Sequence, residues 1–363
     1  MMRNDKLTHL SPARSLSDCP CIAAWPVHIS APFRPIATAI SLQTRENLSS
    51  TSRFFASIRK TRQAPSWNNM LSIDVEDYFQ VSAFEAISPP ATWGKQQLRV
   101  VANTQRVLGL LDDAGVKATF FILGWVAARC PDLVRQIAAA DHEIASHGYG
   151  HQRVGTLTRA EFKDDVQRSK KLLEDISGVA VLGYRAPSYS ISQQTPWAFD
   201  ELLAAGYSYD SSIFPMKHDF YGMADWPRFA GYALKDESGD NGWKPADSKA
   251  VAGTVAGRAA IMELPITTLQ LAGKNLPIAG GGYFRLLPYP FTRWGLQHIN
   301  KVDQQPFVFY LHPWEFDPQQ PRMVGAKWKS RFRHYLNLSK TEGRFKRLLN
   351  DFEFMPIRHR LGL

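Results

Sequence analysis

Strand-like and helix-like stretches alternate between Met70 and about Pro265, and this alternation constrains the fold more than any other feature of the sequence. An apolar stretch begins at Met70, an amphipathic stretch at 98–114 has helical spacing, and a β-rich stretch follows at 117–123. Such alternation predicts parallel strands joined by crossover helices. About seven units fit into this length, which favours an α/β fold with a deformed (β/α) barrel over an open sheet.

The limits of this pattern divide the chain into three parts. Residues 1–69 contain scattered Ser, Pro and Arg without a sustained period, and we expect a disordered or mis-started extension with Met70 as an alternative start. Residues 70–265 form the alternating domain, in which 217–258 is rich in Gly, Asp and Lys and predicts a long loop region. Residues 266–363 form a C-terminal region that carries one more apolar strand and a basic helical tail.

The positive charge lies at the two ends of the chain. The formal net charge is +10, but residues 1–67 hold nine Lys/Arg against three Asp/Glu and residues 327–363 hold ten against three, which leaves the middle slightly acidic. A nucleic-acid enzyme would carry positive charge around its working groove, so no nucleic-acid partner is expected. The basic ends predict solvated surfaces, with peripheral contact to an anionic membrane as an open alternative.

The expected compartment follows from targeting features and cysteine use. No window approaches 18 uninterrupted apolar residues, so no transmembrane helix is expected, and the first residues lack the order of a secretory signal. Cys19, Cys21 and Cys130 are too few and too scattered for a disulfide framework. We therefore expect a cytoplasmic protein with reduced thiols, either free or peripheral to the membrane. The oligomeric state stays open.

Polar residues that can carry chemistry stand where the predicted strands end. In a barrel of parallel strands, catalytic residues gather at the carboxyl ends of the strands, which share one face of the barrel. The candidates of this kind are Asp74, Glu76, His147, Arg185 and His312.

Two histidines and a cluster of acids predict a metal site. His147 and His151 flank a Gly-rich loop that can bring both imidazoles to one ion, and a carboxylate from another strand end would complete a site with open positions for water. Because side chains alternate along a strand, Asp74 and Glu76 point to one side and Asp77 to the other. One acid of the pair can then bind metal while the other acts as a base. Asp77 is the candidate for a structural role.

Two further strand ends carry a cation and an imidazole. Arg185 is followed by Pro187, which fixes the chain at that point, and Arg commonly orders carboxylates by bidentate pairing, so Arg185 is expected to align Asp74. His312 closes a hydrophobic stretch at 307–311, where an imidazole without a partner would be costly to bury.

Six short motifs follow one another along the chain: Ser72-Ile-Asp74-Val-Glu76-Asp77, Ala118-Thr-Phe-Phe-Ile122, Glu143-Ile-Ala-Ser-His147-Gly-Tyr-Gly-His151, Tyr184-Arg-Ala-Pro187, Tyr209-Asp-Ser-Ser-Ile213 and Leu311-His312-Pro-Trp. Taken in order, these motifs resemble the polysaccharide deacetylase family of the NodB-homology type, whose fold is a deformed β/α barrel. Each motif alone is modest, but all six in order over about residues 70–320 are specific. The first motif and the stretch from Leu311 to Pro318 further resemble the subfamily found in exopolysaccharide and PEP-CTERM gene clusters.

The resemblance implies a divalent metal, with zinc as the first choice, held by Glu76, His147 and His151. The family's usual first motif has two adjacent aspartates, base then ligand, whereas Val75 separates the two acids here. Asp77 therefore remains the rival ligand to Glu76.

The resemblance also assigns roles in the hydrolysis of an N-acetylated glycan to a glucosamine-type product and acetate. Asp74 is the general base, oriented by Arg185. His312 is the general acid, with Asp210 as its orienting partner. The residues implied in substrate binding are Pro187, Ser188, Tyr189 and Trp314, with a backbone N–H near Ser188 and Tyr189 for the oxyanion.

Two other functions remain open from the sequence. Cyclic-amide hydrolases of the same superfamily vary in the first motif, so the substrate could be a small ring held in a closed pocket. A catalytically silent glycan-binding module is the second alternative, although such a module need not keep His312.

Overall fold

The computed structural model describes residues 67–216, 222–235, 242–246 and 258–363. All of them belong to one compact unit that runs from Gln63 to Leu363. The predicted extension therefore lies outside the described residues, except for its last three residues.

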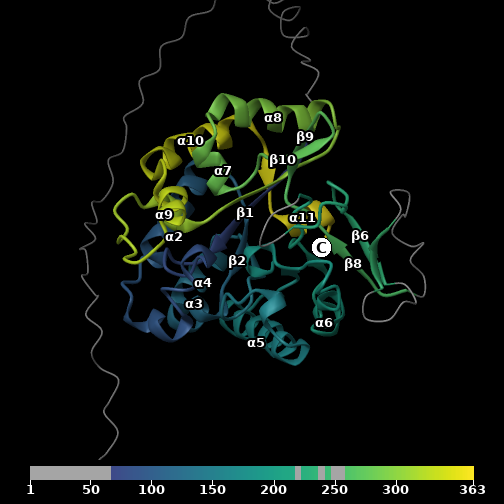
Figure 1. The fold of residues 1–363 in the computed structure, drawn as a ribbon, viewed down its shortest axis with the longest axis horizontal. Helices are drawn as coiled ribbons and strands as arrows, with labels where there is room; N and C mark the ends of the chain where they lie inside the picture. Colours follow the sequence, from purple (N-terminus) through teal and green to yellow (C-terminus); the bar gives the residue numbers. More distant parts are fainter. Residues whose placement is uncertain (1–66, 217–221, 236–241, 247–257) are drawn as a thin grey trace, which may run out of the picture. The chain divides into compact units, whose positions relative to one another are not determined.

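A mostly parallel sheet forms the centre of this unit (Figure 1). Its order is β11-β1-β2-β3-β4-β5-β8-β6-β7, and β12 pairs with β1. Every pairing from β11 to β8 is parallel, while β6 pairs antiparallel with both β8 and β7. The strands are β1 (Asn69–Val75), β2 (Thr119–Ile122), β3 (Glu143–Ser146), β4 (Gly183–Tyr184), β5 (Tyr209–Asp210), β6 (Gly231–Lys235), β7 (Trp243–Pro245), β8 (Ala260–Glu263), β11 (Val308–Leu311) and β12 (Phe354–Met355).

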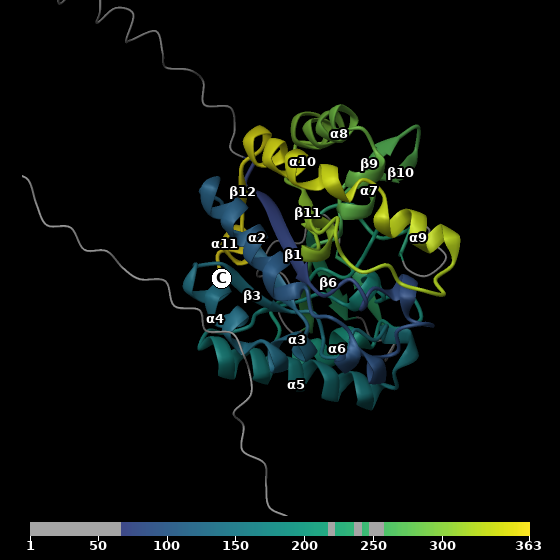
Figure 2. The ribbon, with the colours of Figure 1, turned by 90° about the vertical axis from the view of Figure 1, so that its left-hand side faces the viewer.

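Helices surround the sheet. They are α2 (Val100–Asp113), α3 (Gly124–Arg129), α4 (Pro131–Ala139), α5 (Arg159–Ser177), α6 (Ala198–Ala204), α7 (Gly281–Leu286), α8 (Tyr289–Lys301), α9 (Trp328–Tyr335), α10 (Leu338–Asp351) and α11 (Ile357–Leu361). In both views α3 to α6 gather on one side of the sheet, and α7 to α10 gather on the other, with the hairpin of β9 (Thr268–Leu271) and β10 (Lys274–Pro277) beside α8 (Figures 1 and 2). Within the described ranges, every helix is too short or too polar to span a bilayer.

Local sequence explains the best-formed elements. Every residue of β1 is buried, as expected for a central parallel strand covered on both faces. The predicted capping box is present at the start of α5, where the Thr158 side chain and Glu161 bond each other's backbone N–H groups. The helix ends at Gly178, whose φ of 71° is the left-handed conformation that glycine adopts without penalty.

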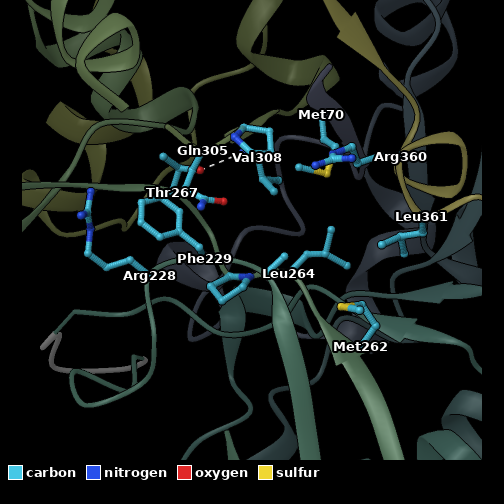
Figure 3. A pocket seen from close by; sticks show the side chains of 13 residues that line it. Met70, Arg228, Phe229, Met262, Leu264, Thr267, Gln305, Val308, Arg360 and Leu361 are labelled. Carbon is cyan, nitrogen blue, oxygen red and sulfur yellow. Dashed lines mark hydrogen bonds between the residues drawn. The ribbon is translucent and has the colours of Figure 1, made fainter. Parts of the chain in front are cut away.

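The expected barrel is not closed by backbone ladders in the described part of the chain, because none joins β8 to β11. The chain that leaves β8 crosses this seam, where the Thr267 hydroxyl accepts a 2.8 Å hydrogen bond from the Val308 N–H. A cavity of about 280 Å³ opens there beside Met70, Leu264 and Val308 (Figure 3). Met70 and Val308 stand near the starts of β1 and β11, so the cavity lies away from the residues that follow the strands' carboxyl ends.

The C-terminal region is built into the same sheet. Its strand β11 pairs with β1, and α11 follows β12 at the starts of β2 and β3. The Thr119 hydroxyl accepts a 2.8 Å bond from the Ile357 N–H, and the Glu143 carboxylate accepts a 2.9 Å bond from the Arg358 N–H.

Two sequence-based boundaries differ from the structure. The strand β1 begins at Asn69, one residue inside the predicted extension, because the Asn69 side chain bonds the backbone N–H of Phe307. The predicted long loop at 217–258 contains β6 and β7, whose pairing with β8 extends the sheet. The rest of that loop lies partly outside the described residues.

Candidate active site

The candidate residues meet because their strands are neighbours in the sheet. Asp74 lies at the end of β1, His147 follows β3, Arg185 follows β4 and His312 follows β11. The order β11-β1-β2-β3-β4 puts these carboxyl ends at one edge. The tertiary arrangement thus gathers the polar strand ends into one site.

Three of these residues form a candidate metal centre. Glu76, His147 and His151 each offer a ligand atom, and these atoms lie within 4.8 Å of one another. His151 Nε2 is 2.6 Å from Glu76 Oε2. Two imidazoles and one carboxylate are a ligand set that zinc uses in catalytic sites, with positions left for water or substrate.

The surroundings of the three ligands fit a divalent cation. His147 Nδ1 donates to the Arg185 carbonyl at 2.8 Å, which leaves Nε2 as the ligand atom. Burial lowers the pKa of His147 to about 4, so its ring is neutral at neutral pH. Glu76 Oε2 is buried, and the ring nitrogen Nε2 of His151 lies 2.6 Å from it, so a carboxylate oxygen and an imidazole nitrogen stand side by side where one ion can bind both.

The pKa of Glu76 is also held low. Burial alone would raise it, but the imidazoles of His151, His312 and His147 outweigh burial and keep the pKa well below its usual range. Glu76 is therefore a carboxylate anion at every pH near neutrality, the form that binds metal.

The loop that carries His151 is fixed by Asp165, a half-buried acid of α5. Asp165 accepts hydrogen bonds from the backbone N–H groups of Tyr149 at 2.9 Å and Gly150 at 3.3 Å. Gly148 has a φ of 71°, and a Cβ there would lie 2.7 Å from an Asp165 oxygen. The glycine therefore lets the loop approach Asp165 closely enough to turn His151 back toward Glu76.

Arg185 holds Asp74 in one orientation. Its buried guanidinium donates to Asp74 Oδ1 at 2.6 Å and to Ser72 Oγ at 2.7 Å, while Nε and Nη2 donate to the carbonyl and hydroxyl of Ser211 at 3.1 and 2.9 Å. The Tyr189 hydroxyl donates to Asp74 Oδ2 at 3.4 Å. The expected alignment of Asp74 by Arg185 therefore matches the hydrogen bonds that the structure contains.

His312 is held by Glu315. Its Nδ1 lies 2.6 Å from Glu315 Oε1, while Arg285 donates to Glu315 Oε2 at 2.7 Å. The other ring nitrogen, Nε2, lies 3.6 Å from Glu76 Oε1 and 4.0 Å from Asp74 Oδ2. Burial alone would lower the pKa of His312, but the carboxylates of Glu76, Glu315 and Asp74 outweigh it and raise the pKa to about 9.

The expectation that Asp210 orients His312 is wrong. Asp210 accepts a 2.6 Å hydrogen bond from the Ser212 hydroxyl and pairs with Glu263 at the ends of β5 and β8. Burial and the neighbouring Asp210 raise the pKa of Glu263, and burial raises that of Asp210, so the two carboxyl groups form a buried structural pair away from His312. Glu315 occupies the place beside His312 because a short turn, η6 (Pro313–Phe316), folds it back onto the ring.

Two of the expected substrate contacts, Trp314 and Tyr189, make hydrogen bonds within the protein. Trp314 is buried, and its indole N–H donates to Glu76 Oε1 at 3.1 Å, so it supports a candidate ligand. The backbone N–H of Tyr189 donates to the Ala186 carbonyl at 3.0 Å and is not available as an oxyanion donor.

The other two expected substrate contacts lie in the same turn. Pro187 is buried, whereas Ser188 is half-buried and its hydroxyl bonds that of Ser82. Ser188 has a φ of 55°, and Tyr189 also has positive φ. Non-glycine residues rarely adopt this conformation, and such residues cluster at functional sites.

Asp77 lies apart from the three candidate ligands. Its carboxylate accepts hydrogen bonds from the backbone N–H groups of Arg99 at 2.7 Å and Val100 at 2.9 Å, at the start of α2, and from that of Tyr78 at 2.9 Å. These contacts give Asp77 the structural role that strand alternation predicted.

Sequence reasoning missed the support of His312. Glu315 stands three residues after His312, the spacing of a capping box, so the sequence did contain a local indication of this pair. Arg285 comes from α7 and Asp165 from α5, and nothing in the local pattern around His312 or His151 points to either.

Two protein-family models match the chain. Residues 92–209 match the model described as polysaccharide deacetylase. Residues 211–361 match a family described only as a domain of unknown function. The first match supports the polysaccharide deacetylase family for the part that holds His147, His151 and Arg185, while His312 lies in the second.

Curated relatives match over a limited length. A peptidoglycan-N-acetylglucosamine deacetylase from Bacillus cereus is 31% identical over 99 residues, which cover 27% of this chain and 36% of the relative. A peptidoglycan deacetylase from Helicobacter pylori is 32% identical over 115 residues, covering 32% of this chain and 38% of the relative. The matched segment thus spans little more than a third of either relative.

A solved structure of a Mycobacterium smegmatis protein, assigned to the polysaccharide deacetylases, aligns over more of the chain. It is 17% identical, covers 83% of this chain and 91% of its own, and has a TM-score of 0.49.

Proposed function

We propose that the protein is a metal-dependent hydrolase that removes N-acetyl groups from an N-acetylated polysaccharide or its precursor. One observation carries the proposal: an arginine-held carboxylate, a three-residue ligand cluster and a carboxylate-paired imidazole converge at one edge of the sheet. These are the groups that hydrolysis of an amide requires, namely a base, a site for a Lewis acid and an acid.

Glu76, His147 and His151 are the residues that would hold the metal, for which we propose Zn²⁺. The mixed nitrogen and oxygen donor set supports zinc over magnesium or calcium, which prefer oxygen ligands alone. When bound, the ion supplies Lewis-acid polarisation of the acetamide carbonyl and lowers the pKa of a water.

Asp74 is the proposed general base. It lies next to Glu76 on the same face of the chain, so it can accept the proton of a water that attacks the acetamide carbon. Arg185 keeps Oδ1 occupied at 2.6 Å, which leaves Oδ2 directed toward the site. The Tyr189 hydroxyl donates to this oxygen only over a long 3.4 Å bond, so Oδ2 keeps a lone pair that can accept the proton.

His312 is the proposed general acid. With Nδ1 committed to Glu315 and a pKa raised to about 9, its Nε2 carries a proton near neutral pH. That proton passes to the sugar nitrogen as the carbon–nitrogen bond breaks, which releases acetate and a free amine.

The curated relatives support a glycan as the substrate class. The sequence motif after β11 supports the proposed biological role. Both curated relatives named above are deacetylases of peptidoglycan glycans by name. The extended motif from Leu311 to Pro318 resembles the exopolysaccharide-locus subfamily, so we place the substrate in exopolysaccharide biosynthesis.

Acetate release from a panel of substrates tests the proposal. Metal-loaded protein should release acetate and an equal amount of free amine from N-acetylglucosamine oligomers or N-acetylated exopolysaccharide. Cyclic amides serve as the contrast. Ring opening of a cyclic amide without acetate release from any glycan would assign the site to the other hydrolase class, and binding without turnover would make the protein a glycan-binding module.

A further inference from the structure

The surface around α9 is basic and aromatic. We define the α9 surface as the exposed residues Arg322, Val324, Lys327, Trp328, Lys329, Arg331, Phe332 and Arg333. Three large apolar side chains on it lie open to solvent: Val324 is 91% exposed, Trp328 72% and Phe332 54%. Trp328 and Phe332 are four residues apart in one helix, so they point to the same side.

The charge around these side chains has one sign. Residues 318–341 contain six Lys/Arg and no Asp or Glu. None of the five cations of the α9 surface forms an ion pair with an acid of the described chain, and Arg322 instead stacks on the Tyr335 ring, 4.0 Å from its centre. These cations, which have no acidic partner in the described chain, surround the exposed apolar side chains. Their charge favours binding to an anionic partner.

The opposite face of α9 is fixed to the body of the protein. The His334 ring stacks on Trp314 with centroids 4.1 Å apart and rings inclined by 12°. His334 also bonds Gln320 at 2.7 Å. Since Trp314 donates to Glu76, the helix is anchored at the active-site end of the sheet.

We propose that the α9 surface binds an anionic phospholipid bilayer, with Trp328 and Phe332 entering the interface and the cations facing the headgroups. Interfacial helices combine Lys and Arg with Trp, Phe or Leu in this way. Ser330 is the only uncharged polar side chain between Arg322 and Arg333, so this surface offers few of the placed hydrogen-bonding groups that orient a hydroxyl-rich ligand. The proposal does not depend on the proposed function, because docking on lipid requires no turnover.

The helix α8 provides an internal contrast. Its Phe291 and Trp294 are 37% and 45% exposed, comparable apolar side chains on a longer helix. Arg293, the cation between these two side chains in the sequence, is paired with Asp351 at 3.0 Å, and the other cation of α8, Lys301, stands at the far end of the helix.

Co-sedimentation with vesicles tests the inference on the full chain. Vesicles of phosphatidylcholine with phosphatidylglycerol should bind the protein, and phosphatidylcholine alone should bind it far less.

The double variant Trp328→Ser, Phe332→Ser should weaken vesicle binding about tenfold or more. Lys329→Gln and Arg331→Gln should each weaken it by about fivefold. Phe291→Ser with Trp294→Ser on α8 should leave it unchanged. Residues 1–67 are present in every variant, so their positive charge contributes equally to all the measurements that are compared.

Three results would overturn the inference. The first is equal binding to the two kinds of vesicle. The second is wild-type binding by the Trp328 and Phe332 double variant with an unchanged melting temperature, which would leave only diffuse electrostatic attraction. The third is displacement of the vesicles by a soluble acidic polysaccharide that binds the wild type but not the Lys329 and Arg331 variants, which would make the surface a glycan site.

Discussion

At the scale of single residues, Glu76 and Asp77 are neighbours in sequence with opposite surroundings. Glu76 faces two imidazoles, whereas Asp77 accepts backbone N–H groups at the start of α2. Glu76→Gln should lower metal affinity and also destabilise the metal-free protein, because a carboxylate whose pKa is held low by imidazoles stabilises the fold at neutral pH. Asp77→Ala should retain metal and lose about 1–3 kcal/mol of stability, because buried backbone donors are left unpaired. Metal loss in Asp77→Ala but not in Glu76→Gln would reverse the assignment.

The pairing of His312 with Glu315 predicts the alkaline limit of activity. The general acid must be protonated, and its pKa is raised to about 9, so activity should persist until the pH approaches that value. Glu315→Gln removes a negative charge at 2.6 Å and should move the falling limb to lower pH by about one unit or more. A pH profile of kcat with unchanged position of this limb would remove Glu315 from its positioning role.

At the scale of elements, the start of α7 lies against Glu315. A Cβ on Gly281 would overlap both carboxylate oxygens of Glu315, whereas a Cβ on Gly282 would meet no atom within 4 Å. Gly281→Ala should therefore displace Glu315 and reduce turnover while metal stays bound. Gly282→Ala is the matched control and should keep turnover. Equal activity of the two variants would show that Glu315 tolerates displacement.

The buried imidazole of His142, next to the start of β3, should make the stability of the protein depend on pH. Its Nδ1 accepts a 3.2 Å bond from the Ala118 N–H, and burial, with a smaller effect of Lys117, lowers its pKa to about 4. A histidine with a folded-state pKa below its unfolded value stabilises the protein fully above about pH 6.5, and this contribution is lost as the pH falls toward 4. Stability should fall by about 2 kcal/mol more between pH 7 and 5 than in His142→Asn, measured by urea unfolding. Parallel pH dependence of the two proteins would contradict this.

The local sequence pattern predicts where strands and helices lie better than it predicts which distant residues contact the site. The strand ends at Asp74, His147 and His312 could be located because hydrophobic stretches and the residues that end them are visible along the chain. Arg285, which supports Glu315, and Asp165, which holds the loop before His151, could not be located in this way. Each comes from a separate helix and reaches the site only through tertiary packing. The carboxylate beside His312 was assigned to Asp210 by family pattern, although Glu315 was nearer in sequence.

At the scale of the whole molecule, the true start of the domain can be measured. The Asn69 side chain bonds Asn300 at 2.9 Å and the Phe307 N–H at 3.1 Å, so a chain that begins at Met70 leaves buried polar groups without a partner. That chain should be less stable than one beginning at Gln63 by about 1–3 kcal/mol, while both keep activity. Equal melting temperatures would show that Asn69 adds nothing.

The central claim is that one metal-supported site performs the hydrolysis, and it is tested by measuring bound metal and acetate release on the same preparations. Wild type should hold about one divalent ion per chain and release acetate. Asp74→Asn should keep the ion and lose turnover by about 10²–10⁴-fold, because a base is removed and no ligand is. The His147→Ala, His151→Ala double variant should lose both ion and turnover. Full metal occupancy in the double variant, or wild-type turnover in Asp74→Asn, would contradict the account.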